Sequence, residues 1–171
     1  ARFTKWRGVY NIGKKYPSKL AINSNAHALA RYSALVQESG MVPIVEPEVL
    51  MDGEHSADDC LIKTSEVIKK CFEELIIHKI DLSGVILKPN MILAGNKSKN
   101  KISNEEVASK TLECLKNSVP KEVPGIAFLS GGQSEIEATE NLNLINKNND
   151  TNFIMTYSYG RALQQSTLKF W

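Results

Sequence analysis

Short apolar runs alternate with longer amphipathic segments along the whole chain, and this alternation restricts the possible folds more than any other feature of the sequence. Each run has the length of a strand and contains β-branched or aromatic residues. The runs are continuous rather than alternating with polar residues, which is typical of parallel strands covered on both faces. Four such runs occur, at residues 41–45, 84–87, 125–129 and 152–156.

The segments between these runs repeat apolar residues at steps of three and four, which predicts helices with one apolar face. One helix is expected over residues 22–38, ending before Gly40, and another over 60–76. Two more are expected to begin after Ser103 and Ser134, because each serine is followed three residues later by a glutamate that can complete a capping box. The resulting β-α-β-α order favours a parallel α/β fold with right-handed crossovers.

Composition excludes several classes of protein. With 42% hydrophobic residues, 23% charged residues and a net charge of +2 over 171 residues, the chain is neither disordered nor a basic nucleic-acid binder. No apolar run approaches the roughly 20 residues that a membrane-spanning helix needs. The first 20 residues lack a signal-peptide pattern, so we expect a cytoplasmic protein. The chain begins without Met, and we expect that the start of the protein is missing.

The cysteines and histidines form no recognisable ligand pattern. The three cysteines are too scattered for a disulfide framework or a metal site, and we expect them to pack in helix cores. His27, His55 and His78 have no partners at metal-ligand or catalytic-triad spacing, so we expect no metal site and no function for them.

Five polar residues follow apolar residues at regular intervals. Each is expected to end a strand, and their separations are 41 or 42 residues and, for the last, 28: Lys5, Glu46, Lys88, Ser130 and Ser158. One β-α unit per step would bring all five to the carboxyl edge of the sheet, where parallel folds carry out chemistry. A (β/α)8 barrel has eight strands over typically about 250 residues. We therefore expect a single domain over residues 1–171 that holds five of eight barrel strands.

Lysine and glutamate at this edge are the groups that Schiff-base chemistry needs. Lys88 lies between Leu87 and Pro89, an apolar setting that disfavours the charged ammonium and favours attack on a carbonyl. Glu46 and Glu48 lie two residues apart, hence on one side of a continuing strand, and a carboxylic acid can both give and take the required proton. The alternatives are a lysine that merely ends a strand, and two carboxylates that neutralise nearby cations.

Two glycine-containing turns after the last two apolar runs could bind phosphate. Residues 130–134 read Ser-Gly-Gly-Gln-Ser, and residues 158–161 read Ser-Tyr-Gly-Arg. Glycines allow an anion to approach backbone N–H groups, and a following helix N-terminus favours negative charge. Turns of this composition also connect strands to helices without binding a ligand, so each turn taken alone allows both interpretations. Arg161 strengthens the phosphate interpretation of the second turn, because it adds a guanidinium group.

Five segments together resemble the class I fructose-bisphosphate aldolase family, in order and in spacing, across essentially the whole chain. They are Lys5-Trp6-Arg7, Val42 to Glu48, Leu87 to Met91, Phe128 to Ser134, and Ser158 to Gln164. The resemblance implies a (β/α)8 barrel, in a family whose members are about twice as long. It also implies metal-free, reversible cleavage of fructose 1,6-bisphosphate to dihydroxyacetone phosphate and glyceraldehyde 3-phosphate in glycolysis and gluconeogenesis.

The resemblance assigns catalytic roles to four residues. Lys88 is similar to the lysine that forms the Schiff base, so the covalent imine takes the place of a cofactor. Glu46 resembles the acid/base that dehydrates the carbinolamine, and Glu48 resembles its hydrogen-bonding neighbour. Lys5 resembles the lysine that polarises substrate hydroxyls near the bond that breaks. An aspartate, a further lysine and a C-terminal tyrosine of the family would fall before Ala1 and after Trp171.

The resemblance also assigns substrate-binding roles and partners. Arg7 resembles a ligand of the phosphate at the far end of the sugar. The turns around Ser130, Gly131, Gly160 and Arg161, with Ser158 beside them, resemble the cradle of the ketose 1-phosphate. The implied partners are a sugar phosphate and three further copies in a homotetramer, with no nucleic acid and no membrane span. A non-catalytic scaffold and another Schiff-base enzyme are the competing readings.

Overall fold

The computed structural model describes residues 1–171 and contains five strands, five α-helices and one 3-10 turn. Strands and helices alternate throughout, as the apolar runs predict. In chain order the elements are β1 (Phe3–Tyr10), α1 (Lys19–Glu38), β2 (Val42–Val49), α2 (Ala57–Ile77), η1 (Leu82–Gly84), β3 (Ile86–Leu87), α3 (Asn104–Ser118), β4 (Gly125–Phe128), α4 (Glu135–Lys147), β5 (Ile154–Tyr157) and α5 (Arg161–Phe170).

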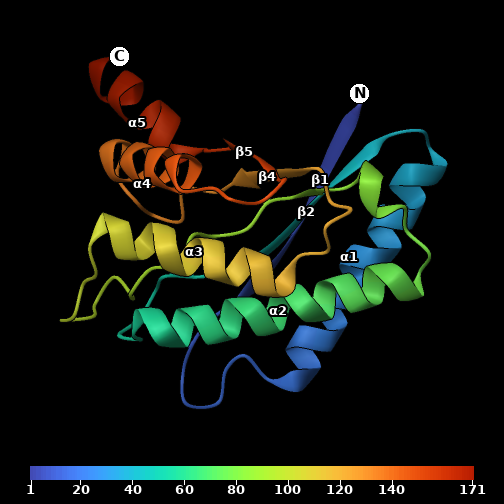
Figure 1. The fold of residues 1–171 in the computed structure, drawn as a ribbon, viewed down its shortest axis with the longest axis horizontal. Coiled ribbons are helices and arrows are strands. Elements are labelled where there is room, and N and C mark those ends of the chain that lie inside the picture. The colour runs from blue at the N-terminus through green and yellow to red at the C-terminus, as the bar shows by residue number, and fades with distance from the viewer.

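The five strands form one parallel sheet whose spatial order is the order of the chain, β1 to β5. A doubly wound sheet would reverse its direction at a switch point, whereas a barrel adds each strand beside the previous one. The helices follow the same rule, since each of α1 to α4 packs against the next and α4 packs against α5. Figure 1 shows α1, α2, α3 and α4 following one another along the sheet. The chain is therefore part of a (β/α)8 barrel.

One apolar core joins the sheet to its helices. It contains 25 buried residues contributed by α1 to α4 and by strands β2 to β5, with Val45, Leu87, Ile126 and Phe128 at its sheet side. The three cysteines are free and buried in this layer, as expected. The core positions the sheet so that polar residues on the strands lie on the face turned away from the helices.

Strands β1 and β2 extend further than the sequence predicts. Lys5 and Glu46 do not end their strands, which continue to Tyr10 and Val49. A polar residue after an apolar run predicts the end of a strand, but side chains in a strand alternate between the two faces of the sheet. A strand can therefore continue through polar residues that lie on the face away from the helices. The other polar positions do follow their strands, with Lys88 directly after β3.

The helix boundaries confirm most of the capping signals. Ser103 and Ser134 both form capping boxes with the glutamate three residues later. Gly40 follows the end of α1 with a φ of 68°, a conformation that glycine adopts without steric cost. A third capping box, between Ser56 and Asp59 at the start of α2, is absent from the sequence prediction because aspartate replaces the usual glutamate. None of the helices is both long enough and apolar enough to cross a membrane.

Candidate active site

Three neighbouring strands bring Lys5, Glu46 and Lys88 into contact. Nζ of Lys5 lies 2.7 Å from Oε2 of Glu46, and Nζ of Lys88 lies 3.2 Å from Oε1 of the same carboxylate. The parallel register pairs Lys5 with Ile44, so Glu46 is the next β2 residue on the same face and is reached diagonally. The sequence predicts this convergence, although it places the residues at strand ends rather than within the strands.

The carboxylate of Glu46 is buried between the two amines, with 5% of its side chain exposed. Its Oε2 makes no aligned hydrogen bond in spite of the short contact with Lys5, which is therefore an ion pair by distance only. Lys5 therefore contacts one oxygen of the carboxylate and Lys88 contacts the other. A carboxylate in direct contact with an amine can exchange a proton with it.

Backbone contacts fix the position of Lys88. Its N–H donates to the carbonyl of Val45 at 2.8 Å, which continues the β2–β3 pairing beyond the end of β3. Two residues later, the buried Asn90 accepts from the N–H of Val49 at 2.9 Å and donates to Thr64 at 3.1 Å. Asn90 thereby joins the segment after β3 both to the end of β2 and to α2. The lysine side chain, 11% exposed, is held by a rigid backbone.

Arg7 and Glu48 form a second ion pair one step further along the same strands. Nε of Arg7 donates to Oε2 of Glu48, and this hydrogen bond raises the pKa of Arg7. Glu48 is buried, whereas nearly half of the Arg7 side chain is exposed. The guanidinium therefore keeps its charge and has free N–H groups for an additional anion. Since β2 does continue through Glu48, the predicted same-side placement of the two carboxylates is correct.

The turn after β4 requires its two glycines. Gly131 and Gly132 have φ values of 54° and 81°, which side chains other than glycine rarely adopt. A Cβ on Gly132 would also lie 2.8 Å from the sulfur of Met51. Two successive residues with these angles turn backbone N–H groups toward one another and can hold an anion. Ser130, before them, is buried, and its carbonyl accepts hydrogen bonds from Gln133.

The turn after β5 differs from the one after β4. Ser158 donates its N–H to the carbonyl of Phe128 at 2.8 Å and so extends the sheet. Gly160 begins α5 without any side-chain cap, whereas α4 has the complete capping box of Ser134. The first N–H groups of α5 thus have no side-chain partner and remain available to an anion. A Cβ at Gly160 would meet nothing within 4 Å, so no close backbone approach explains this glycine.

A cavity of about 280 Å³ lies at the carboxyl end of the sheet, and Lys5, Glu46 and Lys88 are not among the residues that line it. The site residues that line it are Arg7, Glu48, Gly131 and Arg161. The two arginines come from β1 and α5, the first strand and the last helix, so the fold brings together residues that lie far apart in the chain. The cavity walls also contain Gly132 of the predicted turn at 130–134. Four further wall residues are not expected from the sequence, namely Leu50, Met51, Asp52 and Asn96.

The additional wall residues belong to two loops that hold each other. The N–H of Asn96 donates to the carbonyl of Met51 at 2.7 Å, and its side-chain oxygen accepts from the N–H of Gly53 at 3.1 Å. Asp52 accepts from the side chain of Asn96 at 3.4 Å. Their positions in the sequence could have predicted them, because one loop directly follows β2 and the other follows the segment after β3, so both lie at the same edge of the sheet as the site.

Two of the histidines lie closer together than their spacing along the chain indicates. His27 on α1, Glu74 on α2 and His78 at the end of α2 form a group whose potential ligand atoms all lie within 4.8 Å of one another. Spacing along the chain does not reveal this group because α1 and α2 contribute separately. His55 is buried, and both of its ring nitrogens lack hydrogen-bond partners.

Comparisons with known proteins agree with this geometry. The family model for class I fructose-bisphosphate aldolase matches residues 1–171. Fructose-bisphosphate aldolase 4, cytosolic, of Arabidopsis thaliana and the cytoplasmic isozyme of Spinacia oleracea are each 51% identical over all of this chain, which covers 44% and 48% of their lengths. The chain thus spans about half of these relatives.

A solved structure shows the same fold. It is a ternary complex of the fructose-bisphosphate aldolase from Plasmodium falciparum with TRAP and a small-molecule inhibitor. Its TM-score is 0.98 at 45% identity, over 100% of this chain and 50% of that one.

Proposed function

Because this chain belongs to the class I fructose-bisphosphate aldolase family, we propose that the polypeptide that contains it cleaves fructose 1,6-bisphosphate reversibly to dihydroxyacetone phosphate and glyceraldehyde 3-phosphate. This reaction serves glycolysis and gluconeogenesis. The contact of Lys88 with the buried Glu46 carries the proposal, since it joins a nucleophile to an acid/base at 3.2 Å.

The first step is the formation of an imine. Glu46 takes a proton from the ammonium of Lys88, and the free amine adds to the C2 ketone of the sugar. The carbinolamine hydroxyl leaves as water with a proton returned by Glu46. The ammonium and the carbonyl are thereby converted to a protonated imine and water, and the carboxylate of Glu46 is regenerated.

The protonated imine then accepts the electron pair of the C3–C4 bond. The regenerated carboxylate of Glu46 takes the proton of the C4 hydroxyl, so that the C3–C4 bond breaks, glyceraldehyde 3-phosphate leaves and an enamine remains on Lys88. Protonation at C3 and hydrolysis of the imine release dihydroxyacetone phosphate. Lys5, 2.7 Å from Oε2 of Glu46, supplies a positive charge beside the hydroxyls of the reacting carbons. Glu48 holds Arg7 next to this centre.

The cavity supports a substrate with two phosphates. Arg7 provides one guanidinium, for the phosphate at the far end of the sugar, and Arg161 provides another, for the ketose 1-phosphate. Ser130, Gly131, Ser158 and Gly160 add the backbone and hydroxyl groups of the two turns. Arginine suits this role because its planar N–H groups match phosphate oxygens.

Borohydride reduction in the presence of dihydroxyacetone phosphate tests the proposal. The experiment uses the intact polypeptide, and peptide mass mapping should locate the reduced adduct on Lys88. A Lys69→Arg variant is a matched control, because Lys69 lies on α2 away from the cavity, and it should be labelled like wild type. An adduct on another lysine, or no adduct, would refute the assignment.

The same experiment separates the competing functions. The Plasmodium falciparum aldolase was solved in complex with TRAP, so protein binding is a second candidate function for this chain. A scaffold would not require Lys88, Glu46 and both arginines, and it would give no adduct. Another Schiff-base enzyme would form the adduct but would not prefer the bisphosphate over a sugar with one phosphate.

We also propose a cytosolic location and a homotetramer for the intact protein. The relatives named cytosolic and cytoplasmic support the location. The tetramer is an expectation from the family, and sedimentation equilibrium of the intact protein checks it. A monomeric mass over the micromolar range would contradict the tetramer.

A further inference from the structure

Helices α1 and α2 bring two imidazoles and a carboxylate together on the outside of the sheet. Nδ1 of His27 lies 3.5 Å from Oε2 of Glu74, and Nδ1 of His78 lies 4.0 Å from the same oxygen. The two imidazole rings have centroids 5.0 Å apart and are inclined by 66°. Glu74 and His78 are four residues apart, so the last turn of α2 places them on one face.

The separations are close to those in a transition-metal centre. In tetrahedral zinc sites, with bonds of about 2.0–2.2 Å, neighbouring ligand atoms are roughly 3.4 Å apart. The 3.5 Å contact between His27 and Glu74 already matches this value. The widest separation in the group is at most 4.8 Å. Rotation of the His27 side chain, which is 54% exposed, can adjust the distances that involve His27 without moving the backbone. His78 would bind through Nε2 rather than through the Nδ1 atom that lies 4.0 Å from Glu74.

Neighbouring groups orient the potential ligands. Nδ1 of His78 donates to the carbonyl of Glu74 at 2.8 Å, because a carbonyl can only accept, and this leaves the lone pair on Nε2. Metal-binding histidines commonly use their second nitrogen in this way. Nζ of Lys70 lies 3.0 Å from Oε1 of Glu74, so Oε2 is the oxygen turned toward the histidines.

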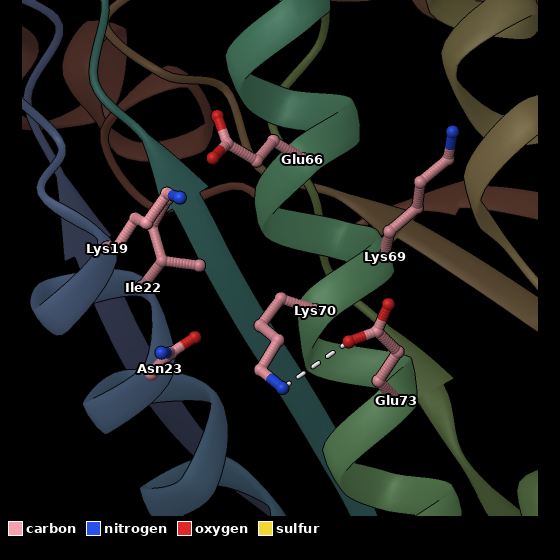
Figure 2. Close-up of a pocket in the computed structure, with 7 residues that line it drawn as sticks. All are labelled: Lys19, Ile22, Asn23, Glu66, Lys69, Lys70 and Glu73. Atoms are coloured by element: carbon pink, nitrogen blue, oxygen red, sulfur yellow. Dashed lines mark hydrogen bonds and ion pairs between the residues drawn. The ribbon is translucent and has the colours of Figure 1, made fainter.

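Lys70 contacts both neighbouring carboxylates of α2, Glu73 and Glu74, through its amine. Figure 2 shows Lys70 extending along the groove between α1 and α2 with its amine near Glu73, 3.3 Å away. Glu73 is thus engaged with Lys70, and it belongs to the lining of that groove rather than to the histidine group.

We propose that His27, Glu74 and His78 bind a divalent transition metal ion, zinc above all, which links α1 to α2. Imidazole suits zinc, copper and nickel, and two imidazoles with one carboxylate leave a fourth position for water. Because α2 leads into the amino end of β3, the site lies away from the carboxyl end where Lys88 and the cavity lie. The metal would therefore stabilise the helix contact and take no part in the cleavage reaction.

Zinc titration of the intact, tag-free polypeptide after treatment with a chelator tests this site. We expect one equivalent of Zn²⁺ to bind, and His27→Ala or Glu74→Gln to weaken binding at least about 10-fold. Glu73→Gln, a neighbouring carboxylate outside the group, should bind like wild type. The buried cysteines should not compete, because burial raises the pKa of Cys71 to about 12 and that of Cys114 to about 11.

Thermal unfolding gives an independent measurement. Saturating zinc should raise the melting temperature of the wild type by about 2–5 °C and leave that of His27→Ala unchanged. The two metal-free proteins should melt alike, since the His27 side chain is largely exposed. Absence of a bound equivalent in wild type, or equal affinities in wild type and His27→Ala, would overturn the proposal.

Discussion

Two charged groups of this molecule differ in how they are held. The group of Lys5, Glu46 and Lys88 takes one residue from β1, one from β2 and one from the segment after β3, and the Glu46 side chain is 5% exposed. The group of His27, Glu74 and His78 takes two residues from one helical turn, and its carboxylate, Glu74, is 15% exposed. Each group also has a more exposed member, Lys5 at 42% and His27 at 54%. The register of the sheet fixes the strand group of Lys5, Glu46 and Lys88, whereas the helix group of His27, Glu74 and His78 includes a side chain that can still rotate.

This difference determines what a substitution does. A buried ion pair that loses one partner leaves an uncompensated charge, which costs about 3–5 kcal/mol. An exposed pair contributes at most about 1 kcal/mol, because water replaces the lost partner. The strand group can therefore perform chemistry with fixed geometry, while the helix group needs a ligand to fix it. Substitutions in the two regions should consequently differ in size by a wide margin.

The largest effect should follow from Lys88→Ala. We expect cleavage to fall below detection, because no other amine in the group is placed to form the imine. The fold should persist, since Glu46 keeps its contact with Lys5. Circular dichroism and steady-state kinetics on the intact protein measure both quantities. Substantial residual turnover would show that Lys88 does not form the imine. It would also contradict the claim that the strand group, unlike the helix group, performs the chemistry.

Glu46→Gln should have the next largest effect. The amide cannot carry a proton between Lys88 and the carbinolamine, so kcat should fall by about 10²–10⁴. The change also leaves the buried amine of Lys88 and the partly exposed amine of Lys5 without their carboxylate, and we expect a lower melting temperature. Glu48→Gln is the matched control, because it alters the neighbouring pair with Arg7 only. Equal effects of the two substitutions on kcat would show that Glu46 is a structural ion-pair partner.

Arg161→Ala should weaken binding with a smaller effect on turnover. A charge-assisted hydrogen bond contributes about 1.5–3 kcal/mol, which corresponds to roughly 10- to 100-fold in affinity for dihydroxyacetone phosphate. Arg161→Lys should recover part of the loss, because it keeps the charge without the planar N–H groups. Competition with a substrate analogue measures these affinities. Unchanged affinity in Arg161→Ala would exclude Arg161 from the phosphate site.

The same contrast explains what the sequence could predict. The core strands and two of the capping boxes are local patterns that the sequence predicts. The five polar positions, spaced by β-α units, are also local, and they predict which edge of the sheet carries the site. The lengths of β1 and β2 cannot be predicted from local patterns, because the charged residues inside these strands are paired with counter-charges on the neighbouring strand. That counter-charge is visible only in the structure.

The missed residues have the same explanation. Asn96 reaches the cavity wall through backbone contacts with the loop after β2, and no periodicity marks such a contact. The histidine group depends on how α1 packs against α2. Glu74 and His78 have a spacing that a helix could use, but His27 lies far earlier in the chain. A sequence pattern shows which residues share one face of a helix, but it does not show which helix faces pack against each other.

The smallest effect should come from an exposed pair on the helices. Lys110 of α3 forms an ion pair with Asp58 in the first turn of α2, and the Asp58 side chain is 73% exposed. Lys110→Met should lower the free energy of unfolding by about 0.5 kcal/mol or less, and 1 M salt should remove the difference.

Asp58→Asn should cost slightly more than Lys110→Met, because Asp58 also interacts favourably with the positive end of the α2 dipole. Denaturant unfolding of the intact protein at two salt concentrations measures both changes. A loss above about 1.5 kcal/mol for Lys110→Met would mean that an exposed helix pair is held as firmly as the buried strand group. Exposure would then no longer support the proposals that Glu46 acts as a fixed catalytic group and that Glu74 binds a metal ion together with the two histidines.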